Sequence, residues 1–145
     1  MKKNRSHCPV NYALEVFGDK WTLLIIRDLA LFNKRTYGEL RKSREKIATN
    51  ILAARLRSME QEGIIAKEIS PEDNKVYLYR LTTKGLDLLP ALFEIALWST
   101  KYDPETAAPP GIIERIKEEP AAVINEIIAA TKSTGNLSCK GEDCQ

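Results

Sequence analysis

The spacing of apolar residues predicts two short helices joined by a turn between positions 36 and 63. The first helix would begin with a capping box, in which Thr36 accepts from the Glu39 amide and the Glu39 side chain reaches back. The second would begin at Thr49, after a turn over residues 43–48 that breaks the helical period. Its apolar residues recur every three or four positions and form one stripe that must face a core. These residues are Leu52, Leu56 and Met59.

The opposite face of the second helix carries side chains suited to reading DNA. Four residues lie between about 100° and 200° around the helix from Leu52. Asn and Arg can pair with two atoms of an adenine or guanine edge, and alanine allows close approach to a thymine methyl. Residues 33–57 carry eight basic and two acidic side chains, which suits binding to phosphates. The candidate base-reading residues are Asn50, Ala53, Ala54 and Arg57.

After Gly63 the period changes from helical to alternating. Two runs, 65–69 and 76–81, flank a polar turn and predict a β hairpin. A helix-turn-helix followed by a hairpin and a new helix is the order of a winged helix-turn-helix, a mainly α fold with a small β hairpin (α+β). This order weakens the alternative, which is a solvated, lysine-rich helical pair in an all-helical domain.

Two helices are predicted ahead of this core. The first would begin at Pro9, with Cys8 at the cap position. The second follows Asp19 and is apolar nearly all round, so it should be central in the fold and end near Asn33. A short strand over residues 34–36 would lead into the helix-turn-helix.

A long helix is predicted after the hairpin, from Thr82 or Thr83 to about Tyr102, with a kink at Pro90, because proline removes an amide hydrogen bond. Its apolar residues cover too much of the circumference for packing on one side. The helix is therefore either sandwiched within the chain or part of an interface between chains. We favour the interface, since DNA-binding proteins of this size commonly dimerise on two half-sites. The candidate interface residues are Val10, Leu14, Leu89, Phe93, Leu97 and Trp98.

Composition divides the chain into three parts. Residues 1–103 would form the winged helix-turn-helix domain with N- and C-terminal dimerisation helices. Residues 104–132 would form a proline-rich linker and two amphipathic helices, and residues 133–145 a disordered tail. The first part has 18 basic and 13 acidic side chains, whereas the remainder has 4 and 7. The basic surplus therefore belongs to the part expected to bind DNA.

Several other classes of protein do not fit this composition. No apolar run reaches membrane-spanning length and the charged start lacks a signal-peptide core, so we expect a cytoplasmic protein without a membrane partner. The three cysteines, Cys8, Cys139 and Cys144, are too few for a disulfide framework, and we expect reduced thiols and no metal site. The chain has one histidine and no phosphate-binding or nucleophile motif, so no cofactor, catalytic residue or enzymatic activity is expected.

Several short motifs are spread over residues 8–102. They include Gly18-Asp19-Lys20-Trp21-Thr22, Leu52-Ala53-Ala54-Arg55-Leu56-Arg57 and Leu81-Thr82-Thr83-Lys84-Gly85. In these motifs the chain resembles the HxlR-type transcriptional regulators, a branch of the MarR-like winged-helix proteins. The resemblance implies a homodimeric DNA-binding regulator, often a repressor, whose dimer interface combines the first helix with the helix after the wing.

The resemblance also directs attention to Cys8. Members of the family often have a cysteine just ahead of the first helix, and in some it senses quinones, aldehydes or oxidants. A thiol at a helix N-terminus beside His7 is also expected to be more nucleophilic than a free thiol. Cys8 is therefore a candidate sensor of a small electrophile or oxidant. The alternative is a small cap residue that packs against the partner subunit.

The remaining predicted DNA contacts surround the second helix of the pair. Arg55 lies about 60° from the apolar stripe and either bridges to neighbouring helices or contacts a phosphate. A competing function is a protein-protein interaction module, in which the winged helix is a docking surface without specific DNA binding. The candidate phosphate-binding residues are Thr36, Lys46 and Thr49, and the candidate wing contacts are Asn74 and Lys75, beside the repelling Glu72 and Asp73.

Overall fold

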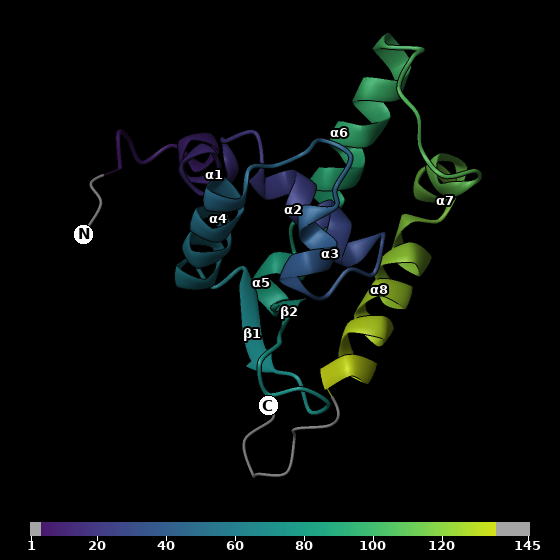
Figure 1. Ribbon diagram of the computed structural model, residues 1–145. Coiled ribbons are helices and arrows are strands. Elements are labelled where there is room, and N and C mark those ends of the chain that lie inside the picture. The colour runs from purple at the N-terminus through teal and green to yellow at the C-terminus, as the bar shows by residue number, and fades with distance from the viewer. Residues whose placement is uncertain (1–3, 136–145) are drawn as a thin grey trace. The chain divides into compact units, whose positions relative to one another are not determined.

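Figure 1 shows the computed structural model of the chain, which describes residues 4–135, without the side chains of residues 133–135. The chain divides into two compact units, Met1–Thr82 and Thr83–Gln145, and each is described here by itself. This division falls directly before Thr83, whereas the boundary predicted from the sequence lies after residue 103. Part of the predicted tail is helical, because the last helix reaches Gly135, and the rest lies outside the described residues.

The first unit is a winged helix-turn-helix, which confirms the predicted fold class. Two leading helices come before the helix-turn-helix pair α3 and α4, and the antiparallel hairpin of β1 and β2 follows it (Figure 1). The elements are α1 (Pro9–Phe17), α2 (Thr22–Ala30), α3 (Tyr37–Arg41), α4 (Thr49–Gln61), β1 (Ile65–Ile69) and β2 (Tyr77–Leu81).

Side-chain caps fix where α2 and α3 begin. The predicted capping box of α3 is present: Thr36 Oγ1 accepts from the Glu39 amide at 3.1 Å and Glu39 Oε1 accepts from the Thr36 amide at 3.3 Å. Asp19 Oδ2 accepts from the amides of Trp21 and Thr22 at 2.9 Å, so α2 begins at Thr22. Burial raises the pKa of Asp19, but these bonds and one from the Thr22 hydroxyl outweigh burial and leave the pKa lowered.

The predicted strand over residues 34–36 is wrong. One backbone hydrogen bond joins this segment to the hairpin, from the Tyr79 amide to the Arg35 carbonyl oxygen at 2.7 Å. Asn33 has a left-handed φ of 52°, so the chain turns sharply there rather than extending. The Arg35 side chain then turns back and donates to the Leu29 carbonyl at the end of α2, at 2.8 Å. Partial burial lowers the pKa of Arg35.

The core of the first unit lies between the helices and the base of the hairpin. Helix α2 packs against β2, and α4 packs against β1. Ile65 pairs with Leu81 at the buried base of the hairpin, whereas Ile69 and Tyr77 pair near the exposed tip. The buried apolar residues of this unit are Ile25, Ile26, Leu29, Leu40, Ile47, Leu52, Leu56, Met59, Ile64, Ile65 and Leu81.

The second unit is helical, with α5 (Thr83–Leu86), α6 (Leu89–Tyr102), α7 (Ile112–Glu118) and α8 (Pro120–Gly135). Both α7 and α8 contact α6 and each other, and Ile116, Val123 and Ile127 are buried. Arg115 of α7 donates to Glu126 of α8 at 2.6 Å, which joins the two helices. No helix in residues 4–135 is long and apolar enough to cross a membrane.

The prediction of one long kinked helix after the hairpin is wrong. The chain leaves the helical conformation in a turn at Asp87 and Leu88, which separates α5 from α6. Pro90 then lies in the first turn of α6, where a helix needs no amide donor. The missing proline amide therefore separates two helices instead of bending one.

Candidate nucleic-acid interface

Helix α4 separates an apolar side from an exposed side, as the sequence predicts. Leu52, Leu56 and Met59 are 0%, 3% and 2% exposed and face the core. On the other side, the candidate base-reading residues Asn50, Ala54 and Arg57 are exposed, and Ala53 is half-buried. Ile51, which the sequence analysis did not select, is also exposed beside them, at 36%.

The first turn of α4 is held by a contact from α3. The Tyr37 hydroxyl donates to the carbonyl oxygen of Thr49 at 3.0 Å, which joins the first residues of the two helices. Ala48 occupies the N-cap position of α4 and provides no side-chain hydrogen bond. The first amides of α4 therefore have no side-chain cap, and an external acceptor such as a phosphate can bind them. Thr49 is exposed at this end.

The turn between α3 and α4 exposes a row of basic side chains. Lys46 has a φ of 54°, in the left-handed region that is unfavourable for residues with a Cβ. Four basic side chains are exposed in this turn, and within the described part of the chain none of them forms an ion pair. We call these residues the basic turn; they are Arg41, Lys42, Arg44 and Lys46.

A network of charged side chains fixes this turn to α2. Arg27 binds Glu45 with two bonds, Nη1 to Oε1 at 2.6 Å and Nη2 to Oε2 at 2.9 Å. The hydrogen bonds from Arg27 lower the pKa of Glu45 from its ordinary value of 4.5 to about 2. The hydrogen bonds that Arg27 donates to Glu45 in turn raise the pKa of Arg27. The two residues are 18 positions apart, so no local pattern in the sequence indicates this pair.

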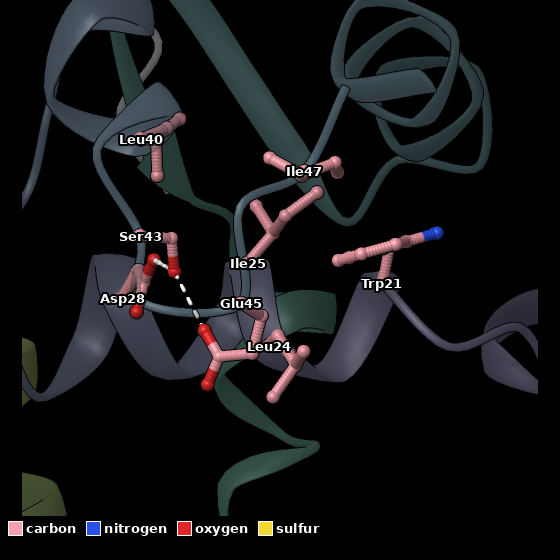
Figure 2. A pocket seen from close by; sticks show the side chains of 8 residues that line it. All are labelled: Trp21, Leu24, Ile25, Asp28, Leu40, Ser43, Glu45 and Ile47. Carbon is pink, nitrogen blue, oxygen red and sulfur yellow. Dashed lines mark hydrogen bonds between the residues drawn. The ribbon is translucent and has the colours of Figure 1, made fainter. Parts of the chain in front are cut away.

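The same network extends inward to Asp28, which is 2% exposed. Figure 2 shows Ser43 between two carboxylates: its Oγ lies 2.8 Å from Asp28 Oδ2 and 2.9 Å from Glu45 Oε2. A hydroxyl has one proton, so Ser43 can donate to one of them at a time. Lys34 Nζ, 3.2 Å from Asp28 Oδ2, adds a second cation to balance the two carboxylates.

This network lines a small cavity in the first unit. Its other lining residues are mostly apolar side chains of α2, α3 and the following turn (Figure 2). The cavity volume is about 10 Å³, which is room for at most one water molecule. The cavity therefore offers no room for a small-molecule ligand. The lining residues are Trp21, Leu24, Ile25, Asp28, Leu40, Ser43, Glu45 and Ile47.

The other predicted phosphate contacts have different surroundings. The hydroxyl of Thr36 donates to Glu39 Oε1 at 3.0 Å and accepts the Glu39 amide, so it is engaged within the capping box. The Thr36 hydroxyl therefore has no proton left to donate to a phosphate. Arg55 lies 3.7 Å from Asp19 Oδ1, which confirms its bridging role between α4 and the cap of α2.

The wing tip is exposed, including both candidate contacts, Asn74 and Lys75. The Asp73 carboxylate accepts from the Lys75 amide at 3.0 Å, so it is turned towards its own backbone. Glu72 is exposed on the same tip. Further along the hairpin, the Lys67 ammonium lies 4.7 Å from the centre of the Tyr77 ring.

Helix α1 has no fully buried residue: Val16 and Phe17 are half-buried, and the other large apolar side chains are exposed. Val10 is 66% exposed and Leu14 is 50% exposed. Tyr12, which the sequence analysis did not select, is 49% exposed on the same short helix.

The remaining candidate interface residues lie on α6, where some are exposed and others are buried. Trp98 is 67% exposed and its ring lies 5.6 Å from that of Tyr102, whereas Leu97 is half-buried. Leu89 and Phe93 are 0% and 2% exposed within one chain. These two side chains belong to the core and offer no surface to a second chain. Ile95 and Tyr102 are exposed and were missed.

Cys8 is exposed and is the N-cap residue of α1, without a side-chain capping bond. The nearby Arg5 donates to Glu15 at 2.9 Å, so its charge is directed to that carboxylate. Among residues 4–135 no group of three or more metal-binding side chains occurs. Cys139 and Cys144 lie outside the described residues.

The structure belongs to the class of winged helix-turn-helix proteins. It has the exposed second helix of the pair, the basic turn before it and the hairpin after it. Residues 16–107 match the HxlR-like helix-turn-helix family. This match covers more than half of the chain, and the chain therefore belongs to that family. Helices α7 and α8 lie beyond the matched residues.

Sequence relatives have regulatory names. A helix-turn-helix-type transcriptional regulator of Mycobacterium bovis is 36% identical over 101 residues, which are 70% of this chain and 63% of that protein. The chain therefore spans less than two thirds of that relative. YdeP of Bacillus subtilis, also called a helix-turn-helix-type transcriptional regulator, is 32% identical over 66% of this chain and 73% of its own length.

Solved structures show the same fold. The crystal structure of PA1607, described as a candidate transcription factor, has a TM-score of 0.64 and 38% identity over 73% of this chain and 74% of that chain. The reduced form of the transcriptional regulator YodB from B. subtilis has a TM-score of 0.55 and 28% identity, over 70% and 100%. The redox regulator HypR in its oxidised form has a TM-score of 0.56 and 26% identity, over 65% and 96%.

Proposed function

We propose that this protein is a DNA-binding transcriptional regulator that acts as a homodimer on an inverted-repeat operator. The observation that carries the proposal is the exposed face of α4, with Asn50, Ala54 and Arg57, on the helix that directly follows the basic turn. The regulatory names of the relatives support it. Occupation of an operator would exclude other proteins from that DNA, so we propose repression as its action.

The proposed roles follow from side-chain chemistry. Asn50 and Arg57 read base edges in the major groove, where each side chain can form two hydrogen bonds to one base. Ala53 and Ala54 allow the helix to approach closely. Lys46 and the first turn of α4 at Thr49 bind phosphates, and Asn74 and Lys75 of the wing contact the backbone or minor groove beside it.

The exposed apolar side chains of α1 and α6 support a homodimer. Helix α1 has no fully buried residue and leaves Val10, Tyr12 and Leu14 exposed, so this side of the helix is expected to pack against a second copy. The proposed interface residues are Val10, Leu14, Leu97 and Trp98, with Tyr12, Ile95 and Tyr102 added from the structure. A two-fold dimer would place two α4 helices on half-sites about one turn of DNA apart.

The test is a titration of duplex DNA at several salt concentrations with the wild type and Arg57→Ala. DNA binding should weaken steeply as the salt concentration rises. The logarithm of the association constant should fall by about 0.9 per phosphate contact for each tenfold rise in salt. Replacing Arg57 should cost about 1–3 kcal/mol on the preferred sequence, leave non-specific affinity nearly unchanged and relax selection at one base position. Equal losses on every sequence would contradict its role as a base reader.

The same titration tests the competing protein-interaction module. Docking through apolar surfaces should depend little on salt, because it releases no condensed counterions. A wild-type protein that binds no duplex, at any salt concentration, would overturn the DNA-binding proposal in favour of that module.

We further propose that Cys8 senses a small electrophile or oxidant. Its exposure at the N-cap of α1 supports this role, because attack requires an accessible thiol and α1 belongs to the proposed dimer interface. YodB has also been solved in quinone-bound and diamide-treated forms, and HypR in oxidised and reduced forms. A quinone or diamide should release the wild type from DNA but not Cys8→Ser. Equal responses of the two proteins would rule out Cys8 as the sensor.

A further inference from the structure

Glu45 is an acidic residue in the middle of the basic turn. It lies between Arg44 and Lys46 in the sequence, three residues before Ala48, the N-cap residue of α4. A carboxylate at this place would repel the phosphates that the neighbouring cations are proposed to bind. Its position therefore needs an explanation that the proposed DNA contacts do not provide.

The geometry of the turn directs Glu45 towards α2. Both carboxylate oxygens accept from Arg27, at 2.6 and 2.9 Å, and the side chain remains 33% exposed. Ser43 provides a further contact to Glu45 at 2.9 Å (Figure 2). A two-bond pair with arginine holds a carboxylate in one orientation, which a single contact to lysine would not do.

Arg27 is itself held in place on several sides. Its Nε and Nη2 donate to the buried Asp28 at 3.0 and 2.7 Å. Its guanidinium carbon lies 5.3 Å from the centre of the Phe32 ring. Arg27 is therefore held on α2 by contacts that do not involve Glu45.

The pairing changes the charge that the turn presents. Arg27 and Glu45 together carry no net charge, so their combined field falls off much faster with distance than that of a free carboxylate. The basic turn, in contrast, keeps its four cations exposed and without ion pairs in the described part of the chain. The surface beside α4 is therefore cationic although its sequence contains an acid.

We propose that Arg27 is a positioning residue that withdraws Glu45 from the DNA-binding surface and so keeps the basic turn free to bind phosphates. The inference rests on the proposed function, because it concerns the same surface. It adds a residue of α2 that touches no DNA but sets how strongly the turn binds.

The experiment is a double-mutant cycle of Arg27→Met and Glu45→Gln, measured as affinity for one duplex at fixed salt. Arg27→Met releases the Glu45 carboxylate, which then repels nearby phosphates, and should weaken binding about threefold or more. Glu45→Gln should then restore about threefold in the Arg27→Met background. In the wild-type background, where the charge is already withdrawn, the same change should alter affinity less than about twofold.

A matched control separates this coupling from general repulsion. Glu72 is an exposed acid on the wing tip and forms no ion pair among the described residues. Glu72→Gln should change DNA affinity by the same factor with and without Arg27. Thermal unfolding of each variant checks that it folds. If Arg27→Met does not fold, the cycle is run with Arg27→Lys, which keeps the charge but loses the two-bond geometry.

The outcomes separate the inference from the proposed function. If Glu45→Gln has the same effect in both backgrounds while the wild type binds DNA, the positioning role of Arg27 is overturned and the regulator remains. If the wild type binds no DNA, the proposed function fails, and the inference fails with it. A gain confined to the background without Arg27 supports both.

Discussion

Lys46 combines an unfavourable backbone conformation with an exposed cationic side chain. A left-handed residue costs roughly 1–2 kcal/mol when it carries a Cβ, and glycine would avoid most of this cost. The basic side chain at this position therefore reduces stability within the turn itself. In the proposed function that cost is offset by a phosphate contact.

Two substitutions at Lys46 should separate stability from DNA binding. Lys46→Gly should leave the free energy of unfolding unchanged or raise it by up to about 1 kcal/mol, since the left-handed backbone relaxes. Lys46→Ala keeps the strained conformation and should not stabilise. Both should weaken binding to all sequences and reduce the logarithmic salt slope by about 0.9. An unchanged salt slope in both variants would contradict the phosphate contact.

Glu45 should make the stability of the protein depend on pH. Its pKa is about 2 in the folded chain and has an ordinary value of 4.5, so the pair with Arg27 stabilises fully above pH 4.5. The stabilisation should disappear as the pH falls from 4.5 towards 2. Because Glu45 is one-third exposed and screened by solvent, we expect a contribution of about 1 kcal/mol.

The measurement compares urea unfolding of the wild type and Glu45→Gln from pH 7 to pH 2. The difference between them should be largest above pH 5 and close to zero near pH 2. Glu72→Gln, at the exposed wing tip, serves as the control. A difference that is constant over this range would show that the ion pair does not stabilise the fold.

At the scale of helices and strands, the sequence identifies elements whose signals are local. The capping box of α3, the apolar stripe of α4 and the alternation of the hairpin each depend on residues close in the chain. The predicted strand after Asn33 failed because Arg35 turns back to α2, a contact that no local pattern encodes. The sequence predicts a kink at Pro90, whereas the structure has a break between α5 and α6. A proline can either bend a helix or lie at the start of a new one, and the local sequence does not decide between the two.

Part of the candidate site could not be predicted from the sequence. The exposed face of α4 follows from helical period alone, and the prediction agrees with the structure in exposure except at Ala53, which is half-buried. The pair of Arg27 and Glu45 joins residues far apart in the chain, and its one local sign is the Arg27-Asp28 dipeptide in a nearly apolar helix. The burial of Leu89 and Phe93 likewise depends on packing that helical period does not determine.

The capping box predicts distinct effects at two threonines. Thr36→Ala removes both hydroxyl bonds at the start of α3 and should lower the free energy of unfolding by about 1 kcal/mol. Thr49→Ala should leave stability nearly unchanged, because its Tyr37 contact uses the backbone carbonyl. If Thr49 binds phosphate, its variant should instead weaken DNA binding. Equal stability losses for the two variants, measured by chemical unfolding, would contradict this assignment.

At the scale of the whole molecule, the exposed apolar side chains of α1 and α6 predict self-association. Trp98→Glu places a charge on a side chain that is 67% exposed in one chain and should prevent a second copy from packing there. Sedimentation equilibrium should then give the mass of a single 16.4 kDa chain, compared with twice that mass for the wild type.

A control variant shows whether the loss of the dimer is specific to this surface. Asn125 is an exposed polar residue of α8, and Asn125→Glu should leave the dimer intact. DNA affinity should fall with Trp98→Glu and not with Asn125→Glu, because a monomer binds only one half-site. A wild type that sediments as a single chain at all concentrations would contradict the proposed dimer.

The most direct test of the account is selection of bound duplexes from a random DNA pool by the purified protein at about physiological salt. We predict enrichment of an inverted repeat with half-sites about one helical turn apart, and loss of that enrichment with Arg57→Ala. A pool that remains random after repeated selection with the wild type would contradict the claim that α4 reads DNA.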